Sequence, residues 1–206
     1  MPANVTSDRA RGRPREFDED AVLEAVMRLF AEKGYEAASL ADIVDVAGLN
    51  KSSLYNTFGS KGKLFQRAIR RYVDQREQLL ELAVSGDRGL DDLRGVIDLA
   101  EAESLSPEGR RGCLAVNSTA ELGFASDDMV ELARQYRETM RRQVRRPLER
   151  AADAGEIDPS MVGVYSETVM SFLLTAMLSA RGGASEEEQR AHFGAMRRLV
   201  DSWRTS

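Results

Sequence analysis

The stretch SLADIVDVAGLNKSSLYNTFGSK, residues 39–61, decides the fold of the N-terminal part of the chain. Ser39 precedes an apolar run and Asp42 follows three residues later, which is a capping-box pattern at a helix start. Gly48 supplies the backbone freedom that a sharp helix-ending turn needs, and Asn50 is suited to cap a second short helix. The spacing therefore predicts two short helices joined by a tight turn, a helix-turn-helix.

The second predicted helix has two different faces. Leu54 and Phe58 are four residues apart and are expected to point into the core. Short polar side chains on an exposed helix face can reach base edges in the major groove of DNA. The opposite face of this helix carries Lys51, Ser52, Ser53, Asn56 and Thr57. This pattern favours binding to double-stranded DNA.

From Arg13 to about Tyr72 the sequence resembles the TetR/AcrR family of transcriptional regulators. The most specific part is DIVDVAGLNKSSLYNTFGSKGKLF, residues 42–65, beside the family pattern Ala-Gly-Val-Ser-Lys-Gly-x-Leu-Tyr-x-x-Phe-x-Ser-Lys. The chain departs from that pattern in Leu49-Asn50 for Val-Ser, in Ser52 for a frequent Gly, and in Gly62-Lys63 where acidic residues commonly stand. The remaining two thirds of the chain resemble the family only in helical layout and length.

The resemblance implies roles for single residues at the DNA surface. It implies that bases are read by Lys51, Ser52, Ser53, Asn56 and Thr57. It also implies that Tyr55 and Lys61 contact phosphates, which suits a hydroxyl and an ammonium that donate hydrogen bonds, and helix N-termini favour anions. Ser39, at the start of the first helix, completes the expected set within the helix-turn-helix.

The charge of the chain is unevenly distributed. The net charge is −5, but residues 1–73 hold 12 Lys and Arg against 10 Asp and Glu, whereas residues 74–206 hold 17 against 24. Arg9, Arg11, Arg13 and Arg15 fall within seven residues. Such a basic arm can neutralise phosphates or enter a minor groove, so Arg11, Arg13 and Arg15 are expected to contact DNA. The alternative is a merely solubilising tail.

Helical periodicity runs through nearly the whole chain, and no convincing strand pattern appears. We expect an all-α fold of about nine helices, with a flexible basic N-terminal arm at 1–16 and a three-helix helix-turn-helix domain at 17–62. A helical-bundle regulatory and dimerisation domain is expected at 63–206. Pro147 lies inside a long helical run, where a kink or an early stop is expected.

The last two predicted helices should form an antiparallel hairpin because the loop between them is short. The helix at 161–181 is apolar nearly all round, which is more than one neighbour can cover. We therefore expect a homodimer whose hairpins form a four-helix bundle, as the resemblance also implies. The expected interface residues are Phe172, Met177, Phe193, Met196, Val200 and Trp203. The alternative is that these faces are the core of a single chain.

The resemblance further implies a small-molecule effector site enclosed by the C-terminal helices. Its candidate residues are Cys113, Asn117, Glu121, Phe124, Tyr136, Met140, Tyr165 and Phe172. Asn117 and Glu121 lie one turn apart on an apolar segment and are the best candidates for convergent polar groups. The alternative is ordinary core, since Met and aromatic side chains at helical spacing usually pack there.

Cys113 stands beside Arg110 and Arg111, and neighbouring cations are typical of reactive cysteines. Some TetR-like regulators have a similar Gly-Cys-Leu-x-x-Asn stretch, which implies a redox or electrophile sensor as one alternative. The other is an inert buried thiol. An enzyme that uses this thiol would need a nearby base, and His192 is the only histidine, so we do not expect an enzyme.

The composition of the chain also indicates its location and its need for cofactors. One cysteine fits a reducing compartment, and no signal-peptide segment opens the chain. The longest uncharged stretch, Thr168 to Ala180, is shorter than the ~20 residues that span a bilayer. We therefore expect a cytoplasmic protein without a membrane partner, a metal site or a cofactor.

The sequence as a whole predicts a sequence-specific transcriptional regulator. We expect a repressor that binds a palindromic operator as a homodimer and is released by an unidentified small-molecule effector. Two alternatives stay open, namely sensing through Cys113 and control by a protein partner.

Overall fold

The computed structural model describes residues 17–122 and 127–205, without the side chains of 119–122 and 127–129. Over this part the fold is all-α, as predicted, with nine α-helices, two short 3-10 turns and no strand. The elements are α1 (Glu19–Lys33), α2 (Leu40–Ala47), α3 (Lys51–Phe58), α4 (Lys61–Ala83), α5 (Leu90–Ser104), η1 (Gly109–Arg111), α6 (Leu114–Leu122), α7 (Asp127–Asp153), η2 (Pro159–Met161), α8 (Val162–Arg181) and α9 (Glu186–Asp201).

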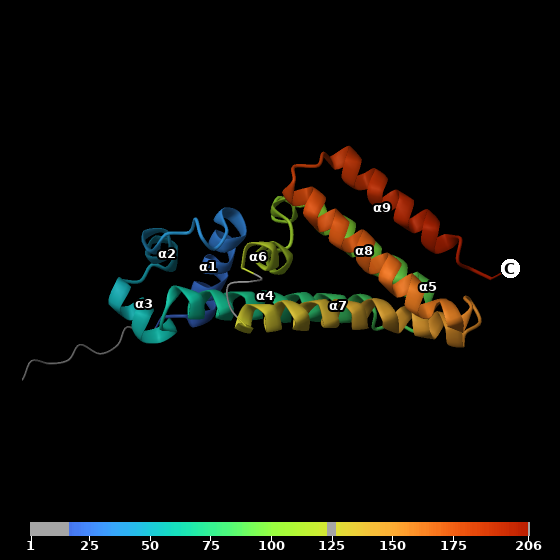
Figure 1. The fold of residues 1–206 in the computed structure, drawn as a ribbon, viewed down its shortest axis with the longest axis horizontal. Coiled ribbons are helices and arrows are strands. Elements are labelled where there is room, and N and C mark those ends of the chain that lie inside the picture. The colour runs from blue at the N-terminus through green and yellow to red at the C-terminus, as the bar shows by residue number, and fades with distance from the viewer. Residues whose placement is uncertain (1–16, 123–126, 206) are drawn as a thin grey trace, which may run out of the picture.

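Helices α1, α2 and α3 gather at the N-terminal end of α4 (Figure 1). Their core is aromatic at its centre, where the rings of Phe30 and Phe65 meet edge to face at 4.7 Å. Ile43 from α2 and both Leu54 and Phe58 from α3 are buried in the same core. The amphipathic spacing read from the sequence is thus the spacing that packs α2 and α3 against α1 and α4.

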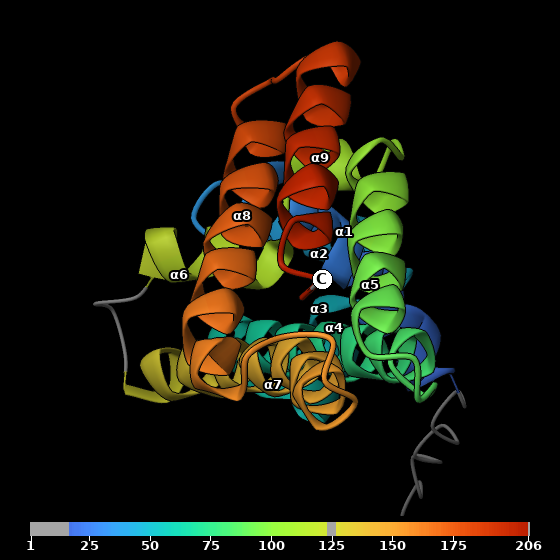
Figure 2. The same cartoon turned by 90° about the vertical axis from the view of Figure 1, so that its right-hand side faces the viewer.

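The two longest helices, α4 and α7, run side by side along the molecule (Figure 1), and α5, α8 and α9 stand together on them (Figure 2). Ion pairs join the C-terminal half of α4 to α7, with Arg142 at 2.9 Å from Glu77 and Arg146 at 2.6 Å from Glu81. Helix α4 therefore carries the three N-terminal helices at one end and is fastened to the rest of the chain at the other.

Helix α7 continues through Pro147 to Asp153, so the predicted early stop at this proline is wrong. Val144, Leu148 and Ala151 on the same helix are almost completely buried. Burial of this apolar face stabilises the helical conformation against the loss of one backbone hydrogen bond at the proline.

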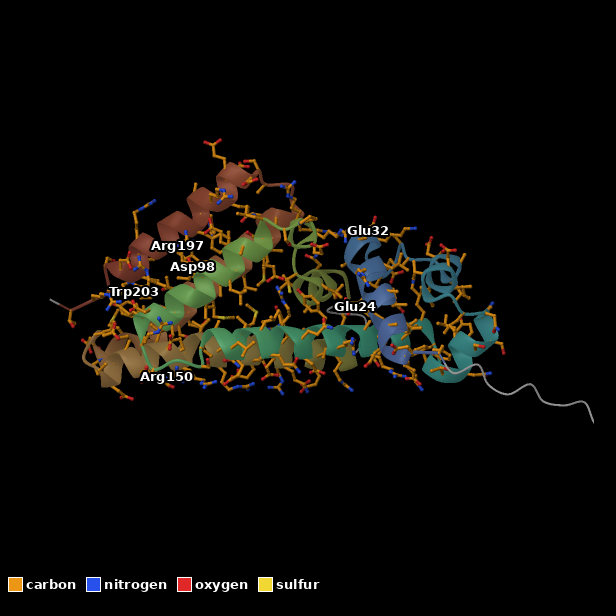
Figure 3. The ribbon with its side chains drawn as sticks, turned by 180° about the vertical axis from the view of Figure 1, so that it is seen from behind. Glu24, Glu32, Asp98, Arg150, Arg197 and Trp203 are labelled. Carbon is orange, nitrogen blue, oxygen red and sulfur yellow. The ribbon has the colours of Figure 1, made fainter. Side chains whose placement is uncertain are left out.

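The C-terminal helix α9 is fastened to α5 and α8. Arg197 on α9 donates to Asp98 on α5 at 2.7 Å, and the two side chains face each other (Figure 3). Trp203, just after α9, stacks on the ring of Tyr165 from α8 at a centroid distance of 3.9 Å. These contacts fix the hairpin of α8 and α9 within one chain.

This packing corrects the predicted dimer interface. Phe193, Met196 and Val200 are each 1% exposed and Trp203 is 9% exposed, all within a single chain. Their own chain covers these side chains, so they form intramolecular core and are not free to meet a partner. Phe172 and Met177 are half-buried. The prediction that placed the apolar stripe of α9 at the dimer interface is therefore wrong.

Among the described residues, one helical segment, Pro159–Arg181, is long and apolar enough to cross a membrane by length and composition alone. Its inner face, which includes Val169, Leu173 and Ala176, is buried inside the protein. The segment thus has one face in the protein core and one face open to solvent.

Arg181 at the end of α8 joins parts that are far apart in the sequence. Its guanidinium donates to the carbonyl oxygens of Ala31 on α1, at 3.1 Å, and of Arg111 in η1, at 3.4 Å. Gly112 has a φ of 74°, and a Cβ there would lie 2.9 Å from the carbonyl oxygen of Met177. Helix α8, the turn before α6 and the last turn of α1 consequently meet at one point.

Candidate DNA-binding interface

Helix α2 starts at the predicted capping box. The Ser39 hydroxyl accepts from the backbone N–H of Asp42 at 3.1 Å and donates to its carboxylate, which also accepts the Ser39 N–H at 2.9 Å. Lys33 on α1 donates to the same carboxylate at 2.7 Å. Hydrogen bonds from Lys33 and Ser39 lower the pKa of Asp42 to about 2. The start of α2 is thereby tied to α1.

The turn between α2 and α3 also has the predicted chemistry. Gly48 lies in the left-handed region with a φ of 62°, which favours glycine. The side chain of Asn50 accepts from the backbone N–H of Ser53 at 2.8 Å and so caps α3. Leu54 and Phe58 hold the inner face of α3, which fixes the direction of its outer face.

The outer face of α3 is polar and open to solvent. Lys51, Ser52 and Asn56 are exposed, and Tyr55 is 38% exposed. Ser53 and Thr57 are half-buried beside them. The structure thus brings the predicted base-reading residues, which carry hydrogen-bond donors and acceptors, together on one short helix.

Two cations flank this surface. Lys51 lies 6.0 Å from the centre of the Tyr55 ring, while Lys61 lies 4.5 Å from the Tyr35 ring and donates to the carbonyl oxygen of Glu36 at 3.4 Å. Burial is the main cause that raises the pKa of Tyr35, which keeps its ring a neutral platform for Lys61. Lys51, predicted to read bases, and Lys61, predicted to contact phosphate, thus each lie beside an aromatic ring. The arm residues Arg11, Arg13 and Arg15 lie outside the described residues.

The C-terminal helices enclose two neighbouring cavities. One holds about 400 Å³ of empty space and the other about 500 Å³, each including a part open to solvent. Arg76, Glu103, Leu173 and Met177 line both. Of the predicted effector-site residues, Cys113 lines the first cavity and Tyr136 and Met140 line the second.

The other predicted effector-site residues have different positions. Asn117 donates to the carbonyl oxygen of Arg111 at 2.9 Å and so holds the turn before α6. Tyr165 stacks on Trp203, and Phe172 lies against the His192 ring at 5.2 Å. Neither aromatic side chain is among those that line the two cavities. The side chain of Glu121 and all of Phe124 lie outside the described part of the chain.

The thiol of Cys113 is buried between two phenols. Its Sγ accepts from the Tyr72 hydroxyl at 3.4 Å and shares a hydrogen bond with the Tyr136 hydroxyl at 3.1 Å. Burial raises the pKa of both tyrosines well above the ordinary value, so both hydroxyls stay protonated. Arg110, its near neighbour in sequence, pairs with Glu186 at 3.9 Å instead. The hydrogen-bond partners of the thiol are therefore neutral.

Sequence reasoning missed the polar residues of the cavity wall. Arg76 and Glu103 form an ion pair between α4 and α5, and Gln143 from α7 lines the larger cavity. A signal was present for Arg76, which stands one turn after Tyr72 on the inner side of α4. Its partner lies 27 residues further on, and such a pairing leaves no periodic trace in the sequence.

Comparison with known proteins identifies the family. Residues 22–68 match the family model of bacterial regulatory proteins, tetR family, and residues 89–200, more than half of the chain, match that of the tetracyclin repressor-like C-terminal domain. This chain belongs to the TetR family. As a TetR-family regulator it is a helix-turn-helix DNA-binding transcription factor and not an enzyme.

Relatives and solved structures agree with this TetR membership. The HTH-type transcriptional repressor ComR of Escherichia coli (strain K12) is 31% identical over 197 residues, 93% of this chain and 92% of that protein. The regulator CifR, a cysteine mutant solved with 26 bp double-strand operator DNA, shares the fold with a TM-score of 0.78 at 23% identity, over 93% of this chain and 100% of that chain. A TetR regulator from Chloroflexus aurantiacus J-10-FL gives a TM-score of 0.82 at 19% identity, over 91% and 96%.

Proposed function

We propose that this TetR-family regulator represses transcription by binding a palindromic operator as a homodimer and is released by a small molecule. The exposed polar face of α3, with Lys51 at its start and Asn56 at its centre, carries the proposal. A helix of this kind presents side chains to the major groove, and two copies read two half-sites. The operator-bound structures of CifR support duplex DNA as the partner of this face.

The outer face of α8 supports the homodimer. Val164 and Leu178 are 56% and 53% exposed at its two ends. Between them, the hydroxyls of Thr168, Ser171 and Thr175 each donate at 2.8 Å to a carbonyl oxygen of α8 itself. These hydroxyls do not need water as an acceptor, so a second copy can cover the face at little desolvation cost. We place the dimer interface here and on the exposed side of α9.

The two cavities support a small-molecule effector, and favour it over the alternative of control by a protein partner. An effector that binds the cavity best when the α3 helices no longer match the half-site spacing would weaken DNA binding, and DNA would weaken effector binding equally. This proposal places DNA reading in residues 17–62, effector binding and dimerisation in 63–206, and the protein in the cytoplasm with its DNA.

Selection of bound duplexes from a random DNA library by the purified protein, at near-physiological salt, tests the proposal. Enrichment of a palindrome, with two chains per duplex in light scattering, is the expected result. Uniform recovery of sequences would refute sequence-specific recognition, and a single chain per enriched duplex would refute the dimer. Placing the enriched site across a promoter in an in vitro transcription assay then separates repression from activation.

A second candidate for the signal is oxidation or alkylation of Cys113. The thiol lines the smaller cavity, where a reactive molecule small enough to enter would meet it. Two phenol hydrogen bonds and 4% exposure hold it away from bulk solvent. Mass spectrometry after graded N-ethylmaleimide decides this point, because absence of labelling in the folded protein would reject the sensor.

A further inference from the structure

Four buried side-chain polar atoms among the described residues have no hydrogen-bond partner. They are Arg71 Nε, Gln143 Oε1, Ser166 Oγ and Gln189 Oε1. Of these, Gln143 lines the larger of the two cavities described above, and the residue is only 3% exposed. A buried acceptor without a donor costs free energy, and a ligand that supplies the donor would recover it.

The orientation of the Gln143 amide follows from its other contact. Its Nε2 donates to a carboxylate oxygen of Glu81 at 3.1 Å, and because a carboxylate only accepts, the nitrogen must be on that side. Glu81 is exposed on α4, so Oε1 is at the opposite end of the amide. Met140 and Tyr136 lie one and two turns earlier on the same face of α7 and line the same cavity. Because Gln143 itself lines the cavity, its unused Oε1 is the acceptor that a bound molecule could satisfy.

The charges of this cavity wall are already matched. Arg76 and Glu103 are its two charged side chains, and they form an ion pair with each other. A charged ligand would find no unpaired counter-charge and would lose its hydration. Most of the remaining wall is apolar, formed by Leu79, Leu80, Val96, Leu99, Leu173 and Met177. The wall thus suits a neutral, apolar molecule with one polar group.

We propose that the effector is a neutral, mostly apolar small molecule with one hydroxyl, of the phenol or alcohol class, which donates a hydrogen bond to Gln143 Oε1. The apolar body fills the space between α4, α5, α7 and α8. The inference rests on the proposed function, since it takes this cavity as the effector site, and it adds the chemistry that the site selects.

Isothermal titration calorimetry on the full chain tests this chemistry with phenol, 4-methylphenol and 4-propylphenol, each beside its methyl ether. The ether keeps the apolar body and removes the donor. In the wild type we expect the better-fitting phenols to bind about tenfold more tightly than their ethers, the size expected for one hydrogen bond. In Gln143→Leu this preference should fall below about twofold.

Gln189→Leu is the matched control, because Gln189 is also 3% exposed with a free Oε1, but it lines neither cavity and its Nε2 donates to the Ala176 carbonyl oxygen. The phenol preference should survive there. Gln143→Met replaces Gln143→Leu if the leucine variant does not fold. The wild-type comparison of phenol with ether needs no variant at all.

Three results would overturn the proposal: no binding by any phenol, equal binding of phenols and ethers, or tighter binding of 4-propylbenzoate than of 4-propylphenol. Fluorescence anisotropy of the selected operator duplex, measured in parallel, separates this inference from the proposed function. Phenol binding that depends on Gln143 without release of DNA would leave the cavity chemistry standing and reject the effector mechanism.

Discussion

At the residue scale, the DNA-binding surface contains two kinds of side chain with different expected effects. Asn56 is exposed at the centre of α3, where its amide can pair with a base edge. Lys61 is at the N-terminus of α4, where its ammonium rests on the Tyr35 ring and can turn to a phosphate. The first should determine which sequence is bound, and the second how strongly any sequence is bound.

Lys61→Ala should therefore weaken binding to all duplexes and reduce the slope of log affinity against log salt by about 0.9 for one phosphate contact. Asn56→Ala should relax the preference at one or two base pairs by about 1–3 kcal/mol and leave the salt slope unchanged. Gel-shift titrations at several salt concentrations measure both quantities. If the two variants behaved alike, the orientation of α3 in the groove would be other than proposed.

The Asp42 carboxylate gives the start of α2 a defined pH dependence. Its pKa is about 2 in the folded protein, below the ~3.9 of an unfolded aspartate, so it stabilises the fold above the unfolded value. This contribution is lost as pH falls through the folded pKa. The stability difference between wild type and Asp42→Asn should be largest above about pH 5 and shrink towards pH 3 in urea unfolding curves.

The contribution of Lys33 to the lowered pKa of Asp42 can be tested separately from that of Ser39. Lys33→Met removes the hydrogen bond that contributes most to the lowered pKa, while the contacts with Ser39 remain. In an NMR titration of the carboxyl carbons, the Asp42 pKa should rise in this variant. An unchanged value would mean that the capping box alone holds it.

At the scale of elements, the junction between α4 and α5 depends on a buried carboxylate. Asp92 is 1% exposed and accepts from the side chain and backbone of Arg88, and it lies 3.5 Å from Arg150 on α7. Arg150 also donates to the carbonyl oxygen of Val84 at 2.7 Å. Arg150 on α7, labelled in Figure 3, thus joins the end of α4 to Asp92 at the start of α5.

Asp92→Ala should lower the free energy of unfolding by about 2 kcal/mol, less than for a fully buried pair because both arginines are partly exposed. Asp87→Ala, in the same turn but exposed, should change it by less than about 0.5 kcal/mol. Chemical unfolding of the two variants at neutral pH makes the comparison. Equal losses would show that the turn itself, and not the carboxylate, holds the junction.

The local features that begin and end the helices could be predicted from the sequence. The segments against which the helices pack could not. Ser39, Gly48 and Asn50 act through hydrogen bonds within four residues, so the sequence contains all that is needed to place α2 and α3. The apolar stripe through Phe193 and Met196 was recognised as buried, but periodicity does not say whether the same chain or a second copy covers it. The early stop predicted at Pro147 was wrong for a related reason, since packing of α7 stabilises a helix that local propensity disfavours.

At the scale of the whole molecule, the exposed face of α8 is the proposed dimer interface. Leu178→Glu places a charge on the face that a second copy is proposed to cover, where burial of an unpaired charge is costly. We expect this variant to be monomeric in light scattering and to lose most of its affinity for a palindromic operator. Binding of one half-site should remain weakly detectable.

Leu82→Glu is the control for this change. Leu82 is 73% exposed on α4 and lies outside the proposed interface. This variant should stay dimeric and bind the operator as the wild type does. A dimeric Leu178→Glu protein would place the interface elsewhere on the chain.

The hydrogen bond from Arg181 to the last turn of α1 bears on how freely the sequence of α1 can vary. Its acceptor is the carbonyl oxygen of Ala31, a group that every residue type possesses. Arg181 consequently holds α1 through a backbone atom, whatever side chain stands at position 31. The α1 sequence can therefore change at position 31 without loss of the hydrogen bond from Arg181.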